Sequence, residues 1–318
     1  MLGIVIPAYK RQNCLRQALQ SLCYQTYQKF SVVIVDDHSP EPLEEVVEEF
    51  DNKLRIIYKY AEVNGGPGAA RQIGLNICYE KDFDLVMFLD SDDMLFPHAV
   101  ERLVNEINLS MSDVASSKIW NDYGNGRGQE LPADNKTFLH GKIFRVNYLR
   151  SNNITFPPLR TNEDLSFNLM AIENTQNVRL VQEVLYLFKY EQNSITRNTT
   201  EKNLHVHSFD YITANYYAAK FLETHNHVTY QIAANALATY NYYQLGLNLG
   251  LKPSEELKEQ IRYLLKLPLI QEVLNEPQKI VQTLQSIKNF TVIGNNIYYY
   301  KQTFYDWLKE FTDEDRSN

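Results

Sequence analysis

The sequence is short of basic residues, of long apolar runs and of cysteine. Its 318 residues include 31 Lys and Arg against 39 Asp and Glu, a formal net charge of −8. A surface without a positive excess is poorly suited to phosphate backbones, so nucleic acid is not expected as a partner. No stretch approaches the ~20 apolar residues of a membrane-spanning helix, and the chain starts with a short strand pattern instead of a leader. We therefore expect a cytoplasmic protein, free or peripheral at a membrane.

Cysteine occurs only three times, as Cys14, Cys23 and Cys78. The number is odd and the spacing is not that of metal ligands. Each cysteine lies among apolar residues of a segment with helical periodicity. This pattern predicts buried free thiols and a reducing compartment.

Glycine and proline are also infrequent, at 12 and 11 positions, whereas 44% of the residues are hydrophobic and 12% aromatic. This composition indicates a globular protein with an ample core and excludes fibrous repeats. The length exceeds that of a usual single domain. We predict one large domain over residues 1–200 and a smaller one over 201–318.

Four strand-then-helix units repeat along the first hundred residues. Short apolar runs cover residues 2–7, 30–37, 54–60 and 84–90. Each run is followed by apolar residues at helical spacing. Strands that are apolar throughout are typical of a parallel sheet covered by helices on both faces. The fold class is therefore predicted to be α/β.

Acids and glycines follow the later strands of this predicted sheet. They are Asp36-Asp37, then Asn64-Gly65-Gly66, then Asp90-Ser91-Asp92-Asp93. In such a sheet the carboxyl ends of the strands share one rim, where ligands bind. Taken alone, the first pair could cap a helix and the glycines could form a tight loop. Their occurrence on the same rim favours a ligand site.

Four blocks of sequence resemble, in order and spacing, the signatures of the family 2 glycosyltransferases of GT-A fold. They are VIPAYKR, VIVDDHSPE, NGGPGAARQIG and FLDSDDMLFP. The resemblance extends over about residues 2–200. It implies a Rossmann-like sheet flanked by helices and an enzyme of the hexosyltransferase class. Such an enzyme transfers a sugar from a nucleotide-sugar donor, a UDP-sugar, to an acceptor hydroxyl with inversion, using Mn²⁺ or Mg²⁺.

The resemblance assigns the acidic turn to the metal and the donor sugar. A divalent ion stabilises the negative charge of a departing nucleotide diphosphate, and hard oxygen ligands suit Mg²⁺ or Mn²⁺. Asp92 is the implied metal ligand, Asp90 faces ribose or sugar hydroxyls, and Asp93 steadies the turn or touches the sugar. The structural alternative is an acidic cap of the helix that follows Pro97.

The same resemblance assigns the nucleotide to the ends of the first three strands. Asp37 is expected to accept a hydrogen bond from uracil N3, and Tyr9 to lie against the base. Arg71 would reach the base or the diphosphate, with a solvated helix-face arginine as the alternative. The remaining donor contacts expected from the blocks are Pro7, Ala8, Asn64, Gly65 and Ser91.

An inverting transfer also needs a base that deprotonates the acceptor hydroxyl. The segment 140–167 resembles the family's stretch around its acidic pair, with Asp164 in the position of the base and Glu163 in that of a positioning or acceptor-binding neighbour. Both acids could instead oppose the positive end of a helix dipole.

Further polar residues around these blocks are also candidates. His140 and Lys142 are read either as acceptor-binding residues or as part of a surface turn. Ser194, Thr196 and Arg197 resemble residues of a loop that closes over the diphosphate.

Beyond residue 200 the pattern becomes helical throughout. Helices are predicted over 202–223, 228–246, 254–266 and 277–288, with breaks at Pro253, Pro268 and Pro277. Tyrosines at helical spacing favour packing of helix on helix or self-association, although they could also stack on a carbohydrate acceptor. The acceptor stays open, since surface polysaccharide, teichoic acid, lipid, protein and modified nucleobase are all compatible.

Two other functions share part of the pattern. A nucleotidyltransferase that makes sugar nucleotides would want a glycine-rich phosphate loop after the first strand, where this chain has PAYKRQN. A non-catalytic interaction module on a GT-A scaffold would not need the acids at positions 37, 90, 92 and 164.

Overall fold

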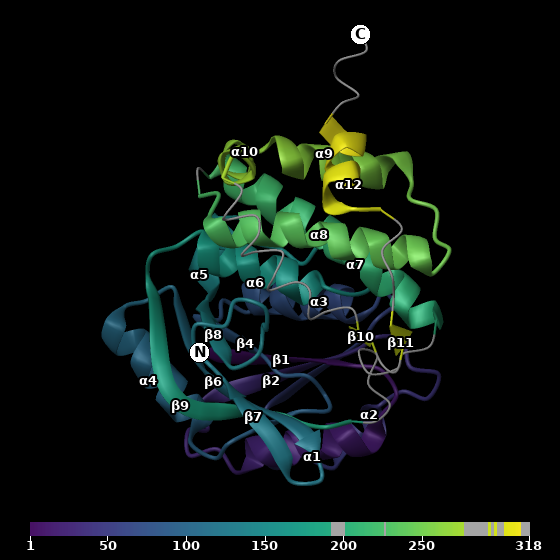
Figure 1. Cartoon of the computed structure of the whole chain (residues 1–318). Helices are drawn as coiled ribbons and strands as arrows, with labels where there is room; N and C mark the ends of the chain where they lie inside the picture. The colour runs from purple at the N-terminus through teal and green to yellow at the C-terminus, as the bar shows by residue number, and fades with distance from the viewer. Residues whose placement is uncertain (192–200, 226, 277–291, 294–295, 298–301, 313–318) are drawn as a thin grey trace. The chain divides into compact units, whose positions relative to one another are not determined.

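The computed structural model describes residues 1–191, 201–225, 227–276, 292–293, 296–297 and 302–312. The chain divides into two compact units, Met1–Glu191 and Gln192–Asn318. The candidate site residues within the described part all lie in the first unit, so the two units are treated separately (Figure 1).

Four parallel strands form one half of the sheet of the first unit. They are β1 (Leu2–Ala8), β2 (Phe30–Asp36), β3 (Ile56–Tyr60) and β4 (Leu85–Phe88), in the order β3-β2-β1-β4. β1 and β2 are buried along their whole length, as expected for strands without a polar face. The predicted parallel α/β core is confirmed.

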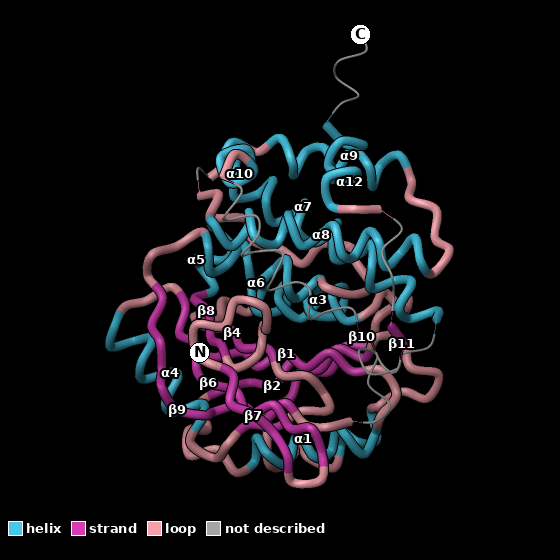
Figure 2. Tube along the Cα trace, viewed as in Figure 1, coloured by secondary structure: helices cyan, strands magenta, loops and turns pink. Residues whose placement is uncertain are grey.

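The other half of the sheet is mixed (Figure 2). It comprises β8 (Lys142–Arg145), β6 (Val114–Gly124), β9 (Val178–Phe188) and the short β5 (Met94–Leu95), while β7 (Arg127–Leu131) pairs with β6. β8 runs antiparallel to both β4 and β6. Because β8 continues the sheet directly from β4, it brings the segment around residue 140 next to the acidic turn.

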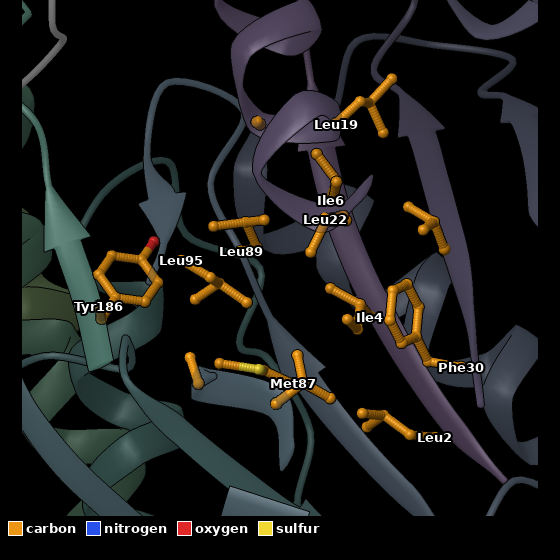
Figure 3. Close-up of a cluster of buried hydrophobic side chains, with 14 of the residues drawn as sticks. Leu2, Ile4, Ile6, Leu19, Leu22, Phe30, Met87, Leu89, Leu95 and Tyr186 are labelled. Atoms are coloured by element: carbon orange, nitrogen blue, oxygen red, sulfur yellow. The ribbon is translucent and has the colours of Figure 1, made fainter. Parts of the chain in front are cut away.

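Helices join the strands of the first unit. They are α1 (Gln12–Cys23), α2 (Glu44–Glu48), α3 (Pro67–Glu80), α4 (Ala99–Ser110), α5 (Val146–Ser151) and α6 (Glu163–Glu173). One apolar cluster packs α1 on the sheet, with Leu19 and Leu22 next to Ile4 and Ile6 (Figure 3). Full burial of one such side chain stabilises the fold by about 1.5–3 kcal/mol.

The cysteines are free thiols, as predicted, but only Cys78 is buried. Cys14 and Cys23 are half-buried because α1 turns Leu15, Leu19 and Leu22 to the core and leaves its cysteines at the margin of that face. The prediction of three buried thiols was wrong on this point.

The second unit is helical in its described part, apart from the short β10 (Val292–Ile293) and β11 (Asn296–Ile297). Its helices are α7 (Glu201–Thr224), α8 (Tyr230–Asn248), α9 (Glu255–Lys266), α10 (Pro268–Leu274) and α12 (Phe304–Thr312). The first three match the predicted helices. The predicted helix 277–288 lies outside the described residues, and Pro268 begins α10, since proline is tolerated in the first turn of a helix.

Tyrosines of the second unit pack helix on helix. Tyr211 of α7 stacks on Tyr242 of α8 with ring centroids 3.7 Å apart. Tyr216 packs edge-on against Tyr263 of α9 at 5.1 Å. Intramolecular packing therefore accounts for these side chains.

Candidate active site

The two acids at the end of β2, Asp36 and Asp37, have different hydrogen-bond partners. Asp36 is fully buried and accepts hydrogen bonds from the Ser39 and Leu43 amides at 2.9 and 3.0 Å and from the Tyr58 hydroxyl at 2.9 Å. It fixes the turn after the strand. Asp37, the second acid, is also buried but binds the loop before α3.

Asp37 connects β2 with the glycine loop that opens α3. Its two carboxylate oxygens accept from the Gly65 and Gly66 amides, each at 2.8 Å, and its backbone carbonyl accepts from the Asn64 side chain at 2.8 Å. Burial raises the pKa of Asp37, and the two amide donors oppose this. Gly66 has φ +86°, a conformation that glycine adopts without strain. The predicted nucleotide residues at positions 37, 64 and 65 are therefore brought together.

The residues after β1 form the next part of the rim. Pro7 and Ala8 are buried in β1, whereas Tyr9 is 40% exposed, with the Lys10 ammonium 4.9 Å from its ring centre. Lys10 and Arg11 both have left-handed backbones, at φ 57° and 64°, a strain of order 1–3 kcal/mol each. This bend directs the Arg11 guanidinium to Asp92, with which it forms an ion pair.

Asp92, the predicted metal ligand, keeps 18% of its side chain exposed. Burial and the neighbouring Asp90 raise its pKa, and Arg11 opposes this. The carboxylate is thus partly accessible, as is that of Asp90, whose side chain is 22% exposed. Ser91, before Asp92, is buried.

Arg71 lies between the acidic turn and the predicted catalytic pair. It is 3% exposed, so the alternative of a solvated helix-face arginine was wrong. Its guanidinium donates to Asp90 Oδ1 at 2.6 Å and to Glu163 Oε1 at 2.5 Å. Burial lowers the pKa of Arg71, but the charges of Asp90 and Glu163 outweigh burial and raise it, so the side chain is a permanent cation.

The other carboxylate oxygen of Asp90, Oδ2, is hydrogen-bonded to Nε2 of His140 at 3.0 Å. Burial raises the pKa of Asp90, but Arg71 and then His140 outweigh this and hold the pKa well below its ordinary value. Burial lowers the pKa of His140, but the charge and hydrogen bond of Asp90, together with the charge of Asp93, outweigh burial and raise it. A continuous series of charged contacts thus runs from Glu163 through Arg71 and Asp90 to His140.

Asp93 is held inside the turn. Its Oδ2 accepts from the Tyr186 hydroxyl at 2.7 Å and its Oδ1 from the Lys189 amide at 2.9 Å. Burial is the main cause that raises the pKa of Asp93. The Tyr186 hydroxyl also accepts from the Asp90 amide at 3.3 Å, so β9 supports both acids.

The side chains of Asp90, Asp93 and His140 form a candidate cation site. Each offers one ligand atom, and the three atoms lie within 4.8 Å of one another. Nδ1 of His140 is buried and has no hydrogen-bond partner within the part of the chain that the structure describes. Two carboxylate oxygens suit Mg²⁺ or Mn²⁺, whereas an imidazole nitrogen is more typical of Zn²⁺, Cu²⁺, Fe²⁺ or Ni²⁺. The residues present therefore fit a divalent ion.

His140 and Lys142 are both buried, so the alternative of a surface turn was wrong. The reason is tertiary, because β8 lies between β4 and β6. The Lys142 ammonium donates to the Phe138 carbonyl at 2.5 Å. Burial lowers the pKa of Lys142 to about 7, and only the charge of Asp164 opposes this.

Glu163 and Asp164 open α6, as predicted. Glu163 is buried, and burial followed by the charge of Asp164 raises its pKa while Arg71 opposes this. Asp164 is half-buried, and its Oδ1 accepts from the Leu165 amide at 2.9 Å. Glu163 therefore faces the interior of the site, and Asp164 keeps an accessible carboxylate.

The structure thus gathers most of the predicted site residues along one edge of the sheet, whereas Ser194, Thr196 and Arg197 lie outside the described residues. Sequence reasoning missed Arg11 and Tyr186. Arg11 belongs to a signature block, but its acid partner is 81 positions away. Tyr186 lies in a strand with no distinguishing motif.

A family model supports the resemblance. The model described as Glycosyl transferase family 2 matches residues 3–161, which is half of the chain. The protein belongs to the glycosyl transferase family 2.

Curated relatives match the same region. Poly(ribitol-phosphate) beta-N-acetylglucosaminyltransferase TarS of Staphylococcus aureus is 29% identical over 202 residues, which are 58% of this chain and 35% of TarS. Poly(ribitol-phosphate) beta-glucosyltransferase of Bacillus spizizenii is 26% identical over 204 residues, 59% of this chain and 32% of that protein. The chain spans about a third of the length of these two relatives.

Solved structures share the fold. S. aureus TarS 1-349 in complex with UDP superposes with a TM-score of 0.54 at 21% identity, over 94% of this chain and 97% of that one. The mannosyltransferase PcManGT of Pyrobaculum calidifontis, in complex with GDP-Man and Mn²⁺, gives 0.54 at 12% identity, over 90% and 86%. These matches confirm the GT-A fold followed by a helical region. In the described part of this chain, no helix is long and apolar enough to cross a membrane.

Proposed function

We propose that the protein is an inverting glycosyltransferase that moves a sugar from a UDP-sugar to an acceptor hydroxyl. The observation that carries the proposal is the contact series from the acidic turn at Asp90, through Arg71, to the acid pair Glu163-Asp164. These contacts join the acidic turn, which the family resemblance assigns to the sugar donor, to the half-buried Asp164. A non-catalytic module has no need for such a costly buried group of charges.

In the proposed reaction Asp164 accepts the proton of the acceptor hydroxyl as this oxygen attacks the anomeric carbon. The bond from that carbon to the diphosphate breaks, and the nucleotide diphosphate leaves. Asp37, with Asn64 and Gly65, holds the base, against which the exposed Tyr9 ring stacks. Asp90 orients the donor sugar or ribose hydroxyls.

A divalent ion belongs to this proposal because a solved structure of the same fold contains Mn²⁺ and because two acids and a histidine lie together here. Asp92, or the cluster of Asp90, Asp93 and His140, would hold it. When bound, the ion would stabilise the negative charge of the diphosphate. Arg11 lies at Asp92, where its guanidinium could pair with phosphate oxygens.

The acceptor proposed here is a hydroxyl-rich polymer. Two relatives are named for poly(ribitol-phosphate), so a polyol-phosphate or a surface polysaccharide is the first class to test. We further propose residues 1–200 as the transferase domain and 201–318 as the part that binds the acceptor or self-associates.

The proposal is tested by incubating the protein with Mn²⁺ and a panel of UDP-sugars and GDP-mannose, without and then with ribitol-phosphate polymers. We expect release of UDP from at least one UDP-sugar, and a mass increase of the polymer by one sugar. No UDP release from any donor, together with no UDP binding by calorimetry, would contradict the proposal. Synthesis of UDP-sugar from UTP and a sugar phosphate would support a nucleotidyltransferase instead.

UDP affinity tests the nucleotide residues. Asp37→Ala should weaken UDP binding by roughly 1.5–3 kcal/mol, because the base loses a hydrogen bond to a charged group. Loss of the carboxylate also frees the Gly65 and Gly66 amides. Calorimetry with UDP measures the change, and Asp51→Ala, an exposed acid on the turn after α2, is the control. Unchanged affinity in Asp37→Ala would remove Asp37 from the donor site.

A further inference from the structure

Arg71 forms ion pairs within the protein that a residue serving only to bind the sugar donor would not need. Both terminal nitrogens of its guanidinium are taken by carboxylates, one from the acidic turn and one from α6. The side chain is almost fully buried, and so is the Glu163 carboxylate. A buried pair with such short contacts is geometrically fixed, because neither partner can leave without exposing an unpaired charge.

We propose that Arg71 is a positioning residue that acts through Glu163, setting the distance between the acidic turn and the base Asp164. The inference rests on the proposed function and assigns to Arg71 a role other than contact with the nucleotide or diphosphate. Asp164 is the residue after Glu163 on the first turn of α6, so the place of Glu163 determines the place of the base.

Gly68 supports this role independently. A Cβ at Gly68 would lie 2.5 Å from Cγ of Glu163, far inside van der Waals contact. The first turn of α3 therefore packs directly on the Glu163 side chain. Arg71, one turn later on the same helix, forms an ion pair with the Glu163 carboxylate. α3 thus fixes Glu163 through close packing at Gly68 and through the ion pair with Arg71.

Loss of Arg71 should affect the chemical step more than donor binding. Without the guanidinium, the half-buried Asp90 and the buried Glu163 have no cation between them, and the first turn of α6 is free to shift. A displacement of about 1 Å can lower turnover about 10²-fold. We therefore expect Arg71→Met to lower kcat about 10²-fold and to leave the Kd for UDP within about threefold.

A double-mutant cycle separates positioning from ligand contact. If Arg71 acts through Glu163, the loss of kcat in Arg71→Met/Glu163→Gln should be close to the larger of the two single losses, because the second change removes nothing further. If Arg71 instead contacts the donor, the losses should multiply and the Kd for UDP should rise in Arg71→Met. Either of these two results would overturn the positioning role.

Matched variants guard against a simple loss of folding. Arg102 also lies between two carboxylates, Glu106 at 2.5 Å and Glu183 at 2.7 Å, but on the surface of α4. Arg102→Met should keep kcat within about twofold, since Arg102 is 40% exposed and Glu106 keeps its ion pair with Arg179. Arg71→Lys retains the charge, and guanidinium ion added to Arg71→Met should restore part of kcat.

If Arg71→Met does not fold, Arg71→Lys takes its place in the cycle with Glu163→Gln and is judged by the same two results. Multiplying losses in a folded Arg71→Met would refute the inference, whether or not guanidinium ion restores kcat. A wild-type protein that releases no UDP from any donor would refute the proposed function itself. If the wild type is active but the losses of the two single variants multiply in the double variant, only the positioning role of Arg71 is refuted and the proposed function stands.

Discussion

Asp164→Asn is expected to lower transfer on the order of 10²- to 10⁴-fold while the affinity for UDP stays near that of the wild type. The substitution keeps the shape of the side chain and removes the group that accepts the acceptor proton, the usual effect of losing a general base. Asp164 adjoins Glu163 and is partly exposed, so its replacement leaves the Arg71 pair in place. Turnover of UDP-sugar and calorimetry with UDP measure the two quantities.

Glu163→Gln is the matched control for this prediction. Glu163 is buried against Arg71, so the amide should disturb the first turn of α6 and lower kcat less than Asp164→Asn does. A greater loss in Glu163→Gln would reverse the two roles. Near-full activity in both variants would mean that the acids only oppose the helix dipole, and the base would have to be sought elsewhere.

Excess chelator is expected to lower transfer about 10³-fold, and added Mn²⁺ or Mg²⁺ should restore it. A divalent ion at a leaving diphosphate is worth several kcal/mol, and each 1.36 kcal/mol corresponds to about tenfold in rate. If Asp92 holds the ion, Asp92→Ala should remove the ion-supported activity and leave the fold intact, because the side chain is partly exposed and is not part of the apolar core. Full activity in chelator would exclude the metal from the mechanism.

The ligand set can be resolved with Mn²⁺ titrations monitored by electron paramagnetic resonance. If Asp92 is the ligand, Asp92→Ala should weaken Mn²⁺ binding and His140→Gln should not. The opposite result would assign the ion to the cluster of Asp90, Asp93 and His140. Glu49→Ala, which removes the acid of a surface pair with Arg16, is the control and should change neither binding nor turnover.

The local pattern of the sequence determined the strands and their acidic ends. Runs such as LGIVIP and FSVVIVD are apolar without alternation, and only a sheet covered on both faces buries such strands completely. The acids after β2 and β4 therefore had to emerge on the same rim. The start of α6 at Glu163 could also be predicted from the sequence, because two acids before an apolar helical run suit the positive end of a helix.

Tertiary structure alone decided which charges are paired and which are accessible. Arg71 and Glu163 are separated by 92 positions, and their ion pair depends on how closely α3 and α6 approach at Gly68. For His140 and Lys142 the sequence left a surface turn or acceptor binding open; β8 places Lys142 in the sheet, and both side chains are buried. Propensity and periodicity act over a few residues, whereas burial and Coulomb energy depend on neighbours that only the folded chain brings together.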